Sequence, residues 1–148
     1  MKNNSNDTPQ LLIENQVCFP LYSAANAIVR AYRPFLDKID VTYLQYIVMM
    51  VLWEELSLNV KELGQRLRLD SGTLTPLLKR LESKGFVERK RSELDERVRI
   101  ISLTAKGIAL KEQAKHIPEK LSCAVDLPAA QLLELKNLCE QFLGGLDN

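Results

Sequence analysis

The chain has 148 residues, a formal net charge of +1, 46% hydrophobic residues, and six glycines and six prolines. This length suits one domain with a sizeable core, and the composition excludes a disordered chain. The longest apolar run, residues 46–53, is too short to span a membrane, and the polar N-terminus is not a signal peptide. Three cysteines without paired spacing exclude a zinc finger and a secreted disulfide framework. We therefore expect a cytoplasmic protein without a cofactor or metal.

Positive charge is concentrated in the middle of the chain. Residues 61–99 carry a net charge of +4, whereas residues 1–60 and 100–148 carry −2 and −1. Such an asymmetry is typical of a module that binds a polyanion, although a solvated surface of mixed charge explains it equally well. Charge alone therefore decides nothing.

The N-terminal segment predicts a flexible tail over residues 1–10, followed by a helix. Pro20 is comfortable only in a first turn, so this helix should begin near Val17–Phe19 and end near Ala31, before Arg33-Pro34. Cys18 then lies at the helix N-terminus. Its neighbours Val17, Phe19, Pro20 and Leu21 predict an apolar pocket around the thiol.

The next segments predict a central helix and then a helix-turn-helix. Thr42 should cap a helix over 43–55, and its apolar run should make that helix fully buried. Asn59 should cap a short helix over 60–67, and a tight turn leads into a second helix over 71–84 that Gly85 ends. Two short helices joined in this way are typical of a helix-turn-helix.

A β-hairpin and two further helices complete the predicted elements. Residues 86–91 and 97–103 are β-type runs joined by a polar segment, which is the pattern of a wing. Thr104 should cap a helix to about His116, which Pro118 interrupts. The last helix, 128–143, aligns an apolar stripe suited to helix–helix packing. The stripe comprises Leu132, Leu135, Cys139, Phe142 and Leu146.

The helix over 71–84 and the wing together predict a DNA-binding surface. Small hydroxyls at a helix N-terminus can approach phosphates and bases closely, and lysine and arginine neutralise phosphates or enter a groove. In the wing, Asp95 could orient Arg97. An ordinary amphipathic helix and a charged hairpin edge are the alternatives, but both parts together favour DNA. The candidates are Ser71, Thr73, Thr75, Pro76, Lys79, Arg80, Arg89, Lys90, Arg91, Asp95, Arg97 and Arg99.

Three stretches carry a resemblance: 69–82, 89–97 and 101–107. They resemble the MarR family of winged-helix repressors. This resemblance implies a mainly α fold with a small β-wing, in which a single domain over 11–148 follows the tail. It also implies a homodimer on double-stranded operator DNA, joined through dimerisation helices at 11–36 and 105–148. The winged helix-turn-helix lobe would span 42–104.

The three cysteines differ in their surroundings. Cys139 lies on an apolar stripe and by default is an inert core residue, and Cys123 is ambiguous. A helix N-terminus stabilises a thiolate at Cys18, whereas burial opposes it, so hydrogen-bond donors are needed. Tyr22, Tyr32 and Tyr43 are the candidate donors.

Residues 15–23, 32–34, 42–46 and 52–54 are similar to one branch of that family, the organic-hydroperoxide-resistance repressors. This resemblance implies that Cys18 is the sensor, oxidised by organic hydroperoxides to a sulfenic acid. Tyr32 and Tyr43 of the partner subunit would supply hydroxyl groups to the Cys18 thiol. Some members of the branch then form mixed disulfides with small thiols, and others use a second cysteine. Cys123 falls about where that second cysteine lies, so we favour an intersubunit disulfide.

Three alternatives stay open from the sequence. A phenolic or lipid-like ligand could release the repressor without covalent chemistry. A thiol peroxidase could pair Cys18 with His116, although nothing in the sequence brings them together, so we expect no enzyme. A metal sensor could use the three cysteines and His116, but recognisable ligand spacing is missing.

Overall fold

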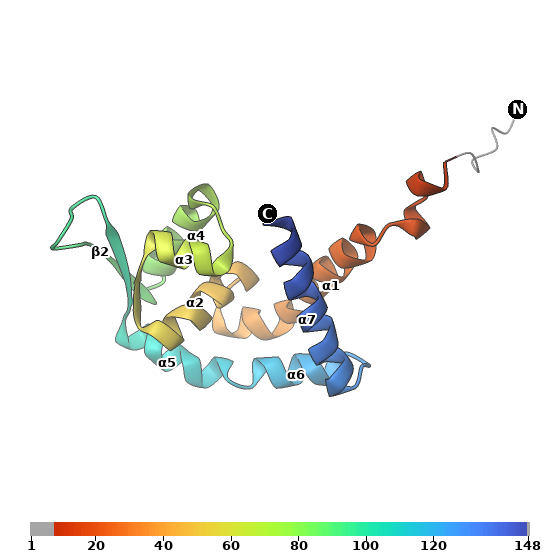
Figure 1. The fold of residues 1–148 in the computed structure, drawn as a ribbon. Helices are drawn as coiled ribbons and strands as arrows, with labels where there is room; N and C mark the ends of the chain where they lie inside the picture. Colours follow the sequence, from red (N-terminus) through yellow and green to blue (C-terminus); the bar gives the residue numbers. More distant parts are fainter. Residues whose placement is uncertain (1–7, 148) are drawn as a thin grey trace, which may run out of the picture. The chain divides into compact units, whose positions relative to one another are not determined.

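A computed structural model describes residues 8–147 and divides the chain into two compact units, one up to Lys115 and one from His116. The first contains 3-10 turns at Pro9–Leu11, Ile13–Asn15 and Asp37–Ile39, helices α1 (Cys18–Leu36), α2 (Tyr43–Glu55), α3 (Val60–Leu67), α4 (Ser71–Ser83) and α5 (Ala105–Ala114), and strands β1 (Ser57–Asn59), β2 (Val87–Arg91) and β3 (Arg99–Leu103). The second contains α6 (Ile117–Ala124) and α7 (Ala129–Leu146). Figure 1 shows these elements. The predicted class, mainly α with a small β-wing, is confirmed.

Side-chain caps begin the four helices α2, α3, α4 and α5. Thr42 and Asn59 accept hydrogen bonds from backbone N–H groups of α2 and α3, as predicted, and each completes a capping box. Asp70 caps α4 and Thr104 caps α5 in the same way. Each cap satisfies an N–H group that the first helical turn leaves without a partner, so these helix starts are encoded locally.

The turn between α3 and α4 is tight because a glycine allows the chain to approach itself. Leu69 N–H donates to the Gly64 carbonyl at 3.0 Å, and a Cβ at Gly64 would lie 2.9 Å from the Leu69 carbonyl oxygen. Arg68 takes a left-handed conformation at φ 53° to reverse the chain. The apolar face of α4 is buried through Leu74, Leu77, Leu78 and Leu81.

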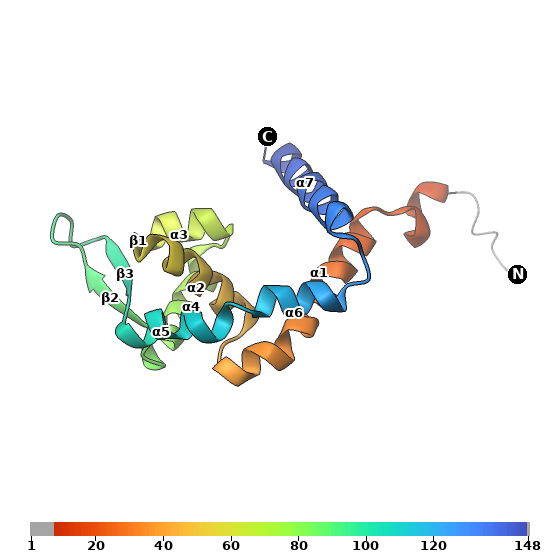
Figure 2. The ribbon, with the colours of Figure 1, turned by 90° about the horizontal axis from the view of Figure 1, so that it is seen from below.

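The sheet has three antiparallel strands in the order β1-β3-β2. The hairpin β2–β3 is registered from Val87 opposite Leu103 to Arg91 opposite Arg99. In Figure 2 its tip extends away from the helices around it. The strand β1 was not predicted, because its three residues give no periodic pattern. The second wing strand begins at Arg99 rather than residue 97, because the Val98 N–H bonds the Asp95 carbonyl and closes a turn there.

The predicted end of α1 is wrong. The helix continues through Pro34 to Leu36 instead of stopping near Ala31. Pro34 cannot donate to the carbonyl four residues back, but it lies in the last turn, where one lost bond is tolerable. Leu36 is 1% exposed and Ile39 is also buried, so packing of this end outweighs the loss.

Smaller differences concern helix ends and burial. The helices α4 and α5 end one and two residues earlier than predicted, and α7 runs to Leu146. The central helix α2 is not fully buried, since Met50 is 45% exposed. Most of the predicted tail lies outside the described residues, and Pro9 begins a short 3-10 turn. Among residues 8–147, no helix is long and apolar enough to cross a membrane.

Candidate nucleic-acid interface and thiol site

The polar face of α4 is open to solvent. All but one of the predicted residues on it are exposed, and Thr75 is half-buried. The Thr73 N–H donates to the Asp70 carboxylate at 2.7 Å and fixes the first turn of α4. The hydroxyl groups at the N-terminus therefore project from an ordered helix start. This face therefore presents small polar groups at the N-terminus and cations further along. The exposed residues are Ser71, Thr73, Pro76, Lys79 and Arg80.

The wing places its cations differently from the prediction. Lys90, Arg91 and Arg99 are exposed on the two strands, but Arg97 lies in the connecting tip and not in a strand. Lys90 pairs with Glu88 at 3.0 Å on the same strand. The hairpin thus carries exposed cations along both strands and one at its tip.

Asp95 orients Arg97 at the wing tip, as the sequence suggested. One carboxylate oxygen of Asp95 accepts the Arg97 backbone N–H at 3.0 Å and its Nε at 3.2 Å. The hydrogen bonds from Arg97 hold the pKa of Asp95 below its usual value. The Arg97 side chain is 91% exposed, so the pair presents a pre-oriented guanidinium to a partner in solution.

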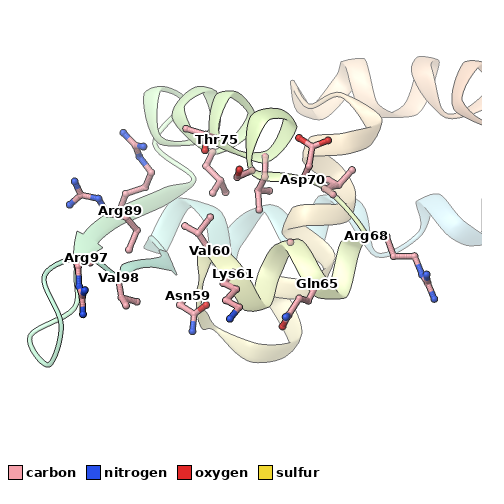
Figure 3. Close-up of a pocket in the computed structure, with 16 residues that line it drawn as sticks. Asn59, Val60, Lys61, Gln65, Arg68, Asp70, Thr75, Arg89, Arg97 and Val98 are labelled. Atoms are coloured by element: carbon pink, nitrogen blue, oxygen red, sulfur yellow. The ribbon is translucent and has the colours of Figure 1, made fainter. Parts of the chain in front are cut away.

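A groove of about 850 Å³ separates α3 from α4 and the base of the wing. Figure 3 shows Arg89 and Arg97 on its wing side, Thr75 on α4, and Lys61 and Gln65 on α3. Sequence reasoning missed the α3 side of the groove and the Arg68 turn. The capping signal at Asn59 could have placed these residues beside α4, but nothing in their spacing marks them as functional.

Arg89 is the one predicted DNA contact whose guanidinium is bound inside the protein. Its side chain is 28% exposed, its terminal nitrogen lies 3.2 Å from the Glu82 carboxylate, and its backbone N–H donates to the other Glu82 oxygen at 3.0 Å. The hydrogen bond from Arg89 lowers the pKa of Glu82. The Arg89 Nε is buried and has no hydrogen-bond partner among the described residues. This residue therefore joins α4 to β2.

Cys18 is the first residue of α1, as predicted, and it is exposed. The expected apolar pocket around it is not formed within the first unit: Val17 is 62% exposed and Phe19 is 48% exposed. Successive side chains at a helix start point in different directions, so sequence neighbours do not enclose one another. A pocket at this thiol would need groups from another part of the assembly.

The predicted tyrosines separate into a cluster and an outlier. The rings of Tyr32 and Tyr43 lie 5.1 Å apart, and Tyr46 lies 5.7 Å from Tyr32. Burial raises the pKa of Tyr32 and raises that of Tyr46 to about 12, so their hydroxyls stay protonated and able to donate. Tyr22 is 68% exposed and is not one of this group.

The other two cysteines belong to the second unit. Cys123 is exposed near the end of α6, and Cys139 is half-buried in the middle of α7. The expectation that Cys139 is a core residue is not met within the described chain, since α7 has no buried residue. No group of three metal-ligating side chains occurs among residues 8–147.

Residues 30–114 match the protein family described as transcriptional regulator SarA/Rot. The organic hydroperoxide resistance transcriptional regulator of Bacillus subtilis is 50% identical over 113 residues, which cover 76% of this chain and 77% of that protein. This chain is a SarA/Rot-family transcriptional regulator. The predicted resemblance to MarR-type winged-helix proteins, and to the hydroperoxide branch in particular, is confirmed.

Solved structures of related regulators agree with this assignment. Reduced AbfR bound to DNA has a TM-score of 0.76 and 36% identity, covering 94% of this chain and 97% of that one; AbfR comes from Staphylococcus epidermidis. A disulfide-formed state of AbfR gives a TM-score of 0.61 at 35% identity, covering 93% and 92%. A MarR mutant from E. coli in complex with operator DNA gives 0.73 at 26% identity, covering 83% and 90%.

The SarA/Rot match has a defined extent within this regulator. It begins in α1 and ends with α5, so it includes the groove, the wing, Tyr32 and Tyr43. Cys18 lies before it and both other cysteines lie after it. The family match therefore identifies the lobe and includes none of the three thiols.

Proposed function

We propose that this regulator binds operator DNA as a homodimer and represses transcription until an organic hydroperoxide oxidises Cys18. The observation that carries the proposal is an exposed thiol at the start of α1 in a chain whose lobe presents a cationic wing and an open helix face. The hydroperoxide regulator and the redox states of AbfR among its relatives support it. The protein acts in the cytoplasm, where its DNA lies, and it is not an enzyme.

The DNA contacts follow from the two exposed surfaces. The N-terminal half of α4 enters the major groove, where hydroxyls and the Pro76 ring reach base edges, and its cations neutralise phosphates. The wing tip carries Arg97, oriented by Asp95, toward the minor groove. The proposed contacts are Ser71, Thr73, Thr75, Pro76, Lys79, Arg80, Lys90, Arg91, Asp95, Arg97 and Arg99; Arg89, which the sequence also suggested, is held by Glu82 and is not one of them.

The homodimer joins through residues 11–36 and 105–148. Apolar side chains on both segments are exposed in the single chain, and burying them against a second copy removes them from water. A two-fold dimer presents two copies of α4 at a spacing of about one DNA turn, which matches a pseudo-palindromic operator. Residues 42–104 form the DNA-binding lobe of each subunit.

The proposed oxidation of Cys18 takes place in two steps. The Cys18 thiolate attacks the hydroxyl oxygen of the hydroperoxide and an S–O bond forms as the O–O bond breaks, which leaves a sulfenic acid. The alkoxide that leaves takes a proton from solvent and becomes the alcohol. The Cys123 thiol of the other subunit then attacks this sulfur, and an S–S bond forms as water leaves. A small thiol in place of Cys123 gives a mixed disulfide instead. Tyr32 and Tyr43, with Tyr22 as a further candidate, donate hydrogen bonds to the Cys18 thiolate.

Release of DNA by peroxide tests the sensor. A fluorescent duplex selected by the reduced wild-type protein from a random-sequence pool serves as the probe. Cumene hydroperoxide should abolish its binding to wild type and leave binding by Cys18→Ser intact, with Cys139→Ser as the matched thiol control. If the Cys18→Ser protein still releases DNA on oxidation, the thiol mechanism is wrong and a non-covalent effector gains support.

A non-reducing gel tests the second step. Oxidised wild type and Cys139→Ser should both run as crosslinked dimers, whereas Cys123→Ser should run as a monomer. A wild-type protein that releases DNA without forming a crosslink overturns the role of Cys123. Mass spectrometry of the same sample then identifies any small thiol attached to Cys18.

A further inference from the structure

Glu82 lies near the end of α4, and its carboxylate is shared by two donors from one residue of the wing. One oxygen accepts the backbone N–H of Arg89 at 3.0 Å, and the other accepts its guanidinium at 3.2 Å. β2 is an edge strand of the sheet, and the Arg89 N–H bonds the Glu82 carboxylate on its open side. The carboxylate therefore completes the hydrogen bonding of the sheet edge while it holds the side chain.

The setting of the Arg89 guanidinium differs from that of the other wing cations. Its Nε is buried without a partner among residues 8–147, and the side chain is 28% exposed, compared with 74% for Lys90 and 91% for Arg97. Arg97 is bonded to Asp95 but its side chain stays exposed to a partner, whereas the Arg89 side chain is mostly buried. Moving Arg89 toward DNA would break the Glu82 contacts and leave a carboxylate without its partners.

From this arrangement we infer that Glu82 and Arg89 are positioning residues, a clamp that fixes the wing relative to α4 so that both reach DNA in one register. The inference rests on the proposed DNA binding, but it assigns Arg89 a role different from phosphate contact. The clamp spans the base of the hairpin, whose outer end carries Arg97. A small rotation at the base moves the tip by a larger distance, so loss of the clamp misplaces Arg97 most.

The clamp predicts a characteristic pattern in DNA binding. Glu82→Ala and Arg89→Gln should each weaken binding to the selected duplex about tenfold, and the double variant should lose little more, because both remove one device. The matched control is Glu88→Ala, which breaks the exposed Glu88–Lys90 pair on the same strand, and its affinity should stay within about twofold of wild type. Glu82→Gln keeps an acceptor for the backbone N–H and should have an intermediate effect.

Salt dependence separates positioning from phosphate contact. Each neutralised phosphate contributes about 0.9 to the slope of log K against log salt concentration. Arg89→Gln should leave this slope unchanged, whereas Arg91→Gln, which removes an exposed cation, should lower it by about one contact. A slope that falls equally in both variants overturns the inference, and so does wild-type affinity in the Glu82→Ala protein.

Hydrogen exchange tests the clamp without DNA. Glu82→Ala should speed exchange of the Arg89 amide, while the amides bonded between β1 and β3 keep their protection. Unchanged exchange at Arg89 overturns the clamp whether or not the protein binds DNA. Wild-type protein that selects no duplex would instead refute the proposed function, so the two failures are distinguishable. Far-UV circular dichroism confirms that each variant is folded, and Glu82→Gln replaces Glu82→Ala if that protein is not.

Discussion

The winged-helix lobe and the helices that flank it are constructed in different ways. The lobe helices α2, α3 and α4, and α5 directly after the lobe, each begin at a side chain that accepts a backbone N–H, whereas α1, α6 and α7 begin without such a cap. The lobe buries four leucines of α4 alone, but α7 buries no residue along its 18-residue length. The helices of the lobe are thus stabilised by caps and buried side chains that lie within the same chain.

This difference teaches where the stability of the regulator comes from. Helices without caps and without buried faces gain little from one chain, since most helical stability in proteins comes from packing of an apolar face. Leu135, Leu138 and Phe142 of α7 are 45%, 55% and 41% exposed. We interpret α7 as an element that reaches full stability only in the proposed homodimer, whereas α1 buries Leu36 and α6 buries Ile117 and Leu121 within one chain.

Alanine substitutions of Gly107 in α5 and Gly144 in α7 should give the largest difference in the free energy of unfolding. A Cβ at Gly107 in α5 would collide with the Phe86 carbonyl, which already accepts the Thr104 N–H at 3.1 Å and cannot move freely. Gly107→Ala should therefore lower the free energy of unfolding by about 4 kcal/mol. A Cβ at Gly144 in α7 meets no atom within 4 Å, so Gly144→Ala should raise it by up to about 1 kcal/mol.

Urea unfolding of both alanine variants measures this contrast. A Gly144→Ala protein that is destabilised would show that another group packs against α7 in the assembly. A Gly107→Ala protein as stable as wild type would show that the close approach of α5 to the strand entrance is relaxed in solution.

Leucines of equal size give a second, smaller contrast. Leu78→Ala in the core of the lobe should cost about 3 kcal/mol at every protein concentration, because the residue is 1% exposed and its removal leaves a cavity. Leu135→Ala should instead weaken the dimer, so its unfolding midpoint should fall most at low protein concentration. Urea midpoints across a concentration series separate the two. A concentration-independent loss for Leu135→Ala contradicts its place in a dimer interface.

Sequence patterns predicted the lobe well because its signals are local. The caps at Thr42 and Asn59 and the glycine after α4 each depend on residues close in sequence, and the structure has each of them. The unpredicted features depend on partners distant in sequence. The strand β1 exists through its pairing with β3, and α1 passes through Pro34 because Leu36 is anchored in the core.

The candidate site shows the same division between local and distant signals. The Asp95–Arg97 pair is two residues apart, so its geometry could be anticipated. The Glu82–Arg89 pair joins a helix to a strand, so its geometry could not be anticipated from the sequence. The charge of Arg89 alone predicted a DNA contact. The pocket expected at Cys18 is not formed by one chain, because residues adjacent in sequence at a helix start do not enclose one another.

The cap at Thr104 should give a moderate effect. Its hydroxyl accepts the Gly107 N–H at 3.0 Å and donates to the Gly85 carbonyl at 2.6 Å, so it joins α5 to the chain before β2. Thr104→Ala should lower the free energy of unfolding by about 2 kcal/mol. In α7, where Pro128 offers no side-chain cap, Pro128→Ser should be neutral or slightly stabilising. Urea unfolding of both proteins measures the difference, and equal losses would contradict the division into capped and uncapped regions.

The smallest effect concerns pH and contrasts an ion pair between elements with one inside a helix. Hydrogen bonds from Arg89 hold the pKa of Glu82 in the folded lobe below its ordinary value of 4.5. The stabilisation is therefore fully present above pH 4.5 and is lost as the pH falls through the lowered pKa. Because Glu82 is 39% exposed, its contribution should be below about 1 kcal/mol.

Glu82→Gln should thus be less stable than wild type at pH 7, and the difference in stability should narrow as the pH falls below 4.5 and wild-type Glu82 becomes protonated. The comparison is Glu140→Gln in α7, where Glu140 pairs with Lys136 one turn away at 2.8 Å and contributes about 0.5 kcal/mol or less. Salt should reduce the stability lost in Glu140→Gln more than the stability lost in Glu82→Gln. The reason is that the Arg89 backbone N–H also bonds Glu82 and that the Arg89 side chain is mostly buried. Urea midpoints measured from pH 3 to pH 7 at low and high salt test both statements. A Glu82→Gln difference that does not narrow between pH 7 and pH 3 would mean that its cause is packing rather than charge, and the contact between α4 and β2 would then owe nothing to the ionised carboxylate.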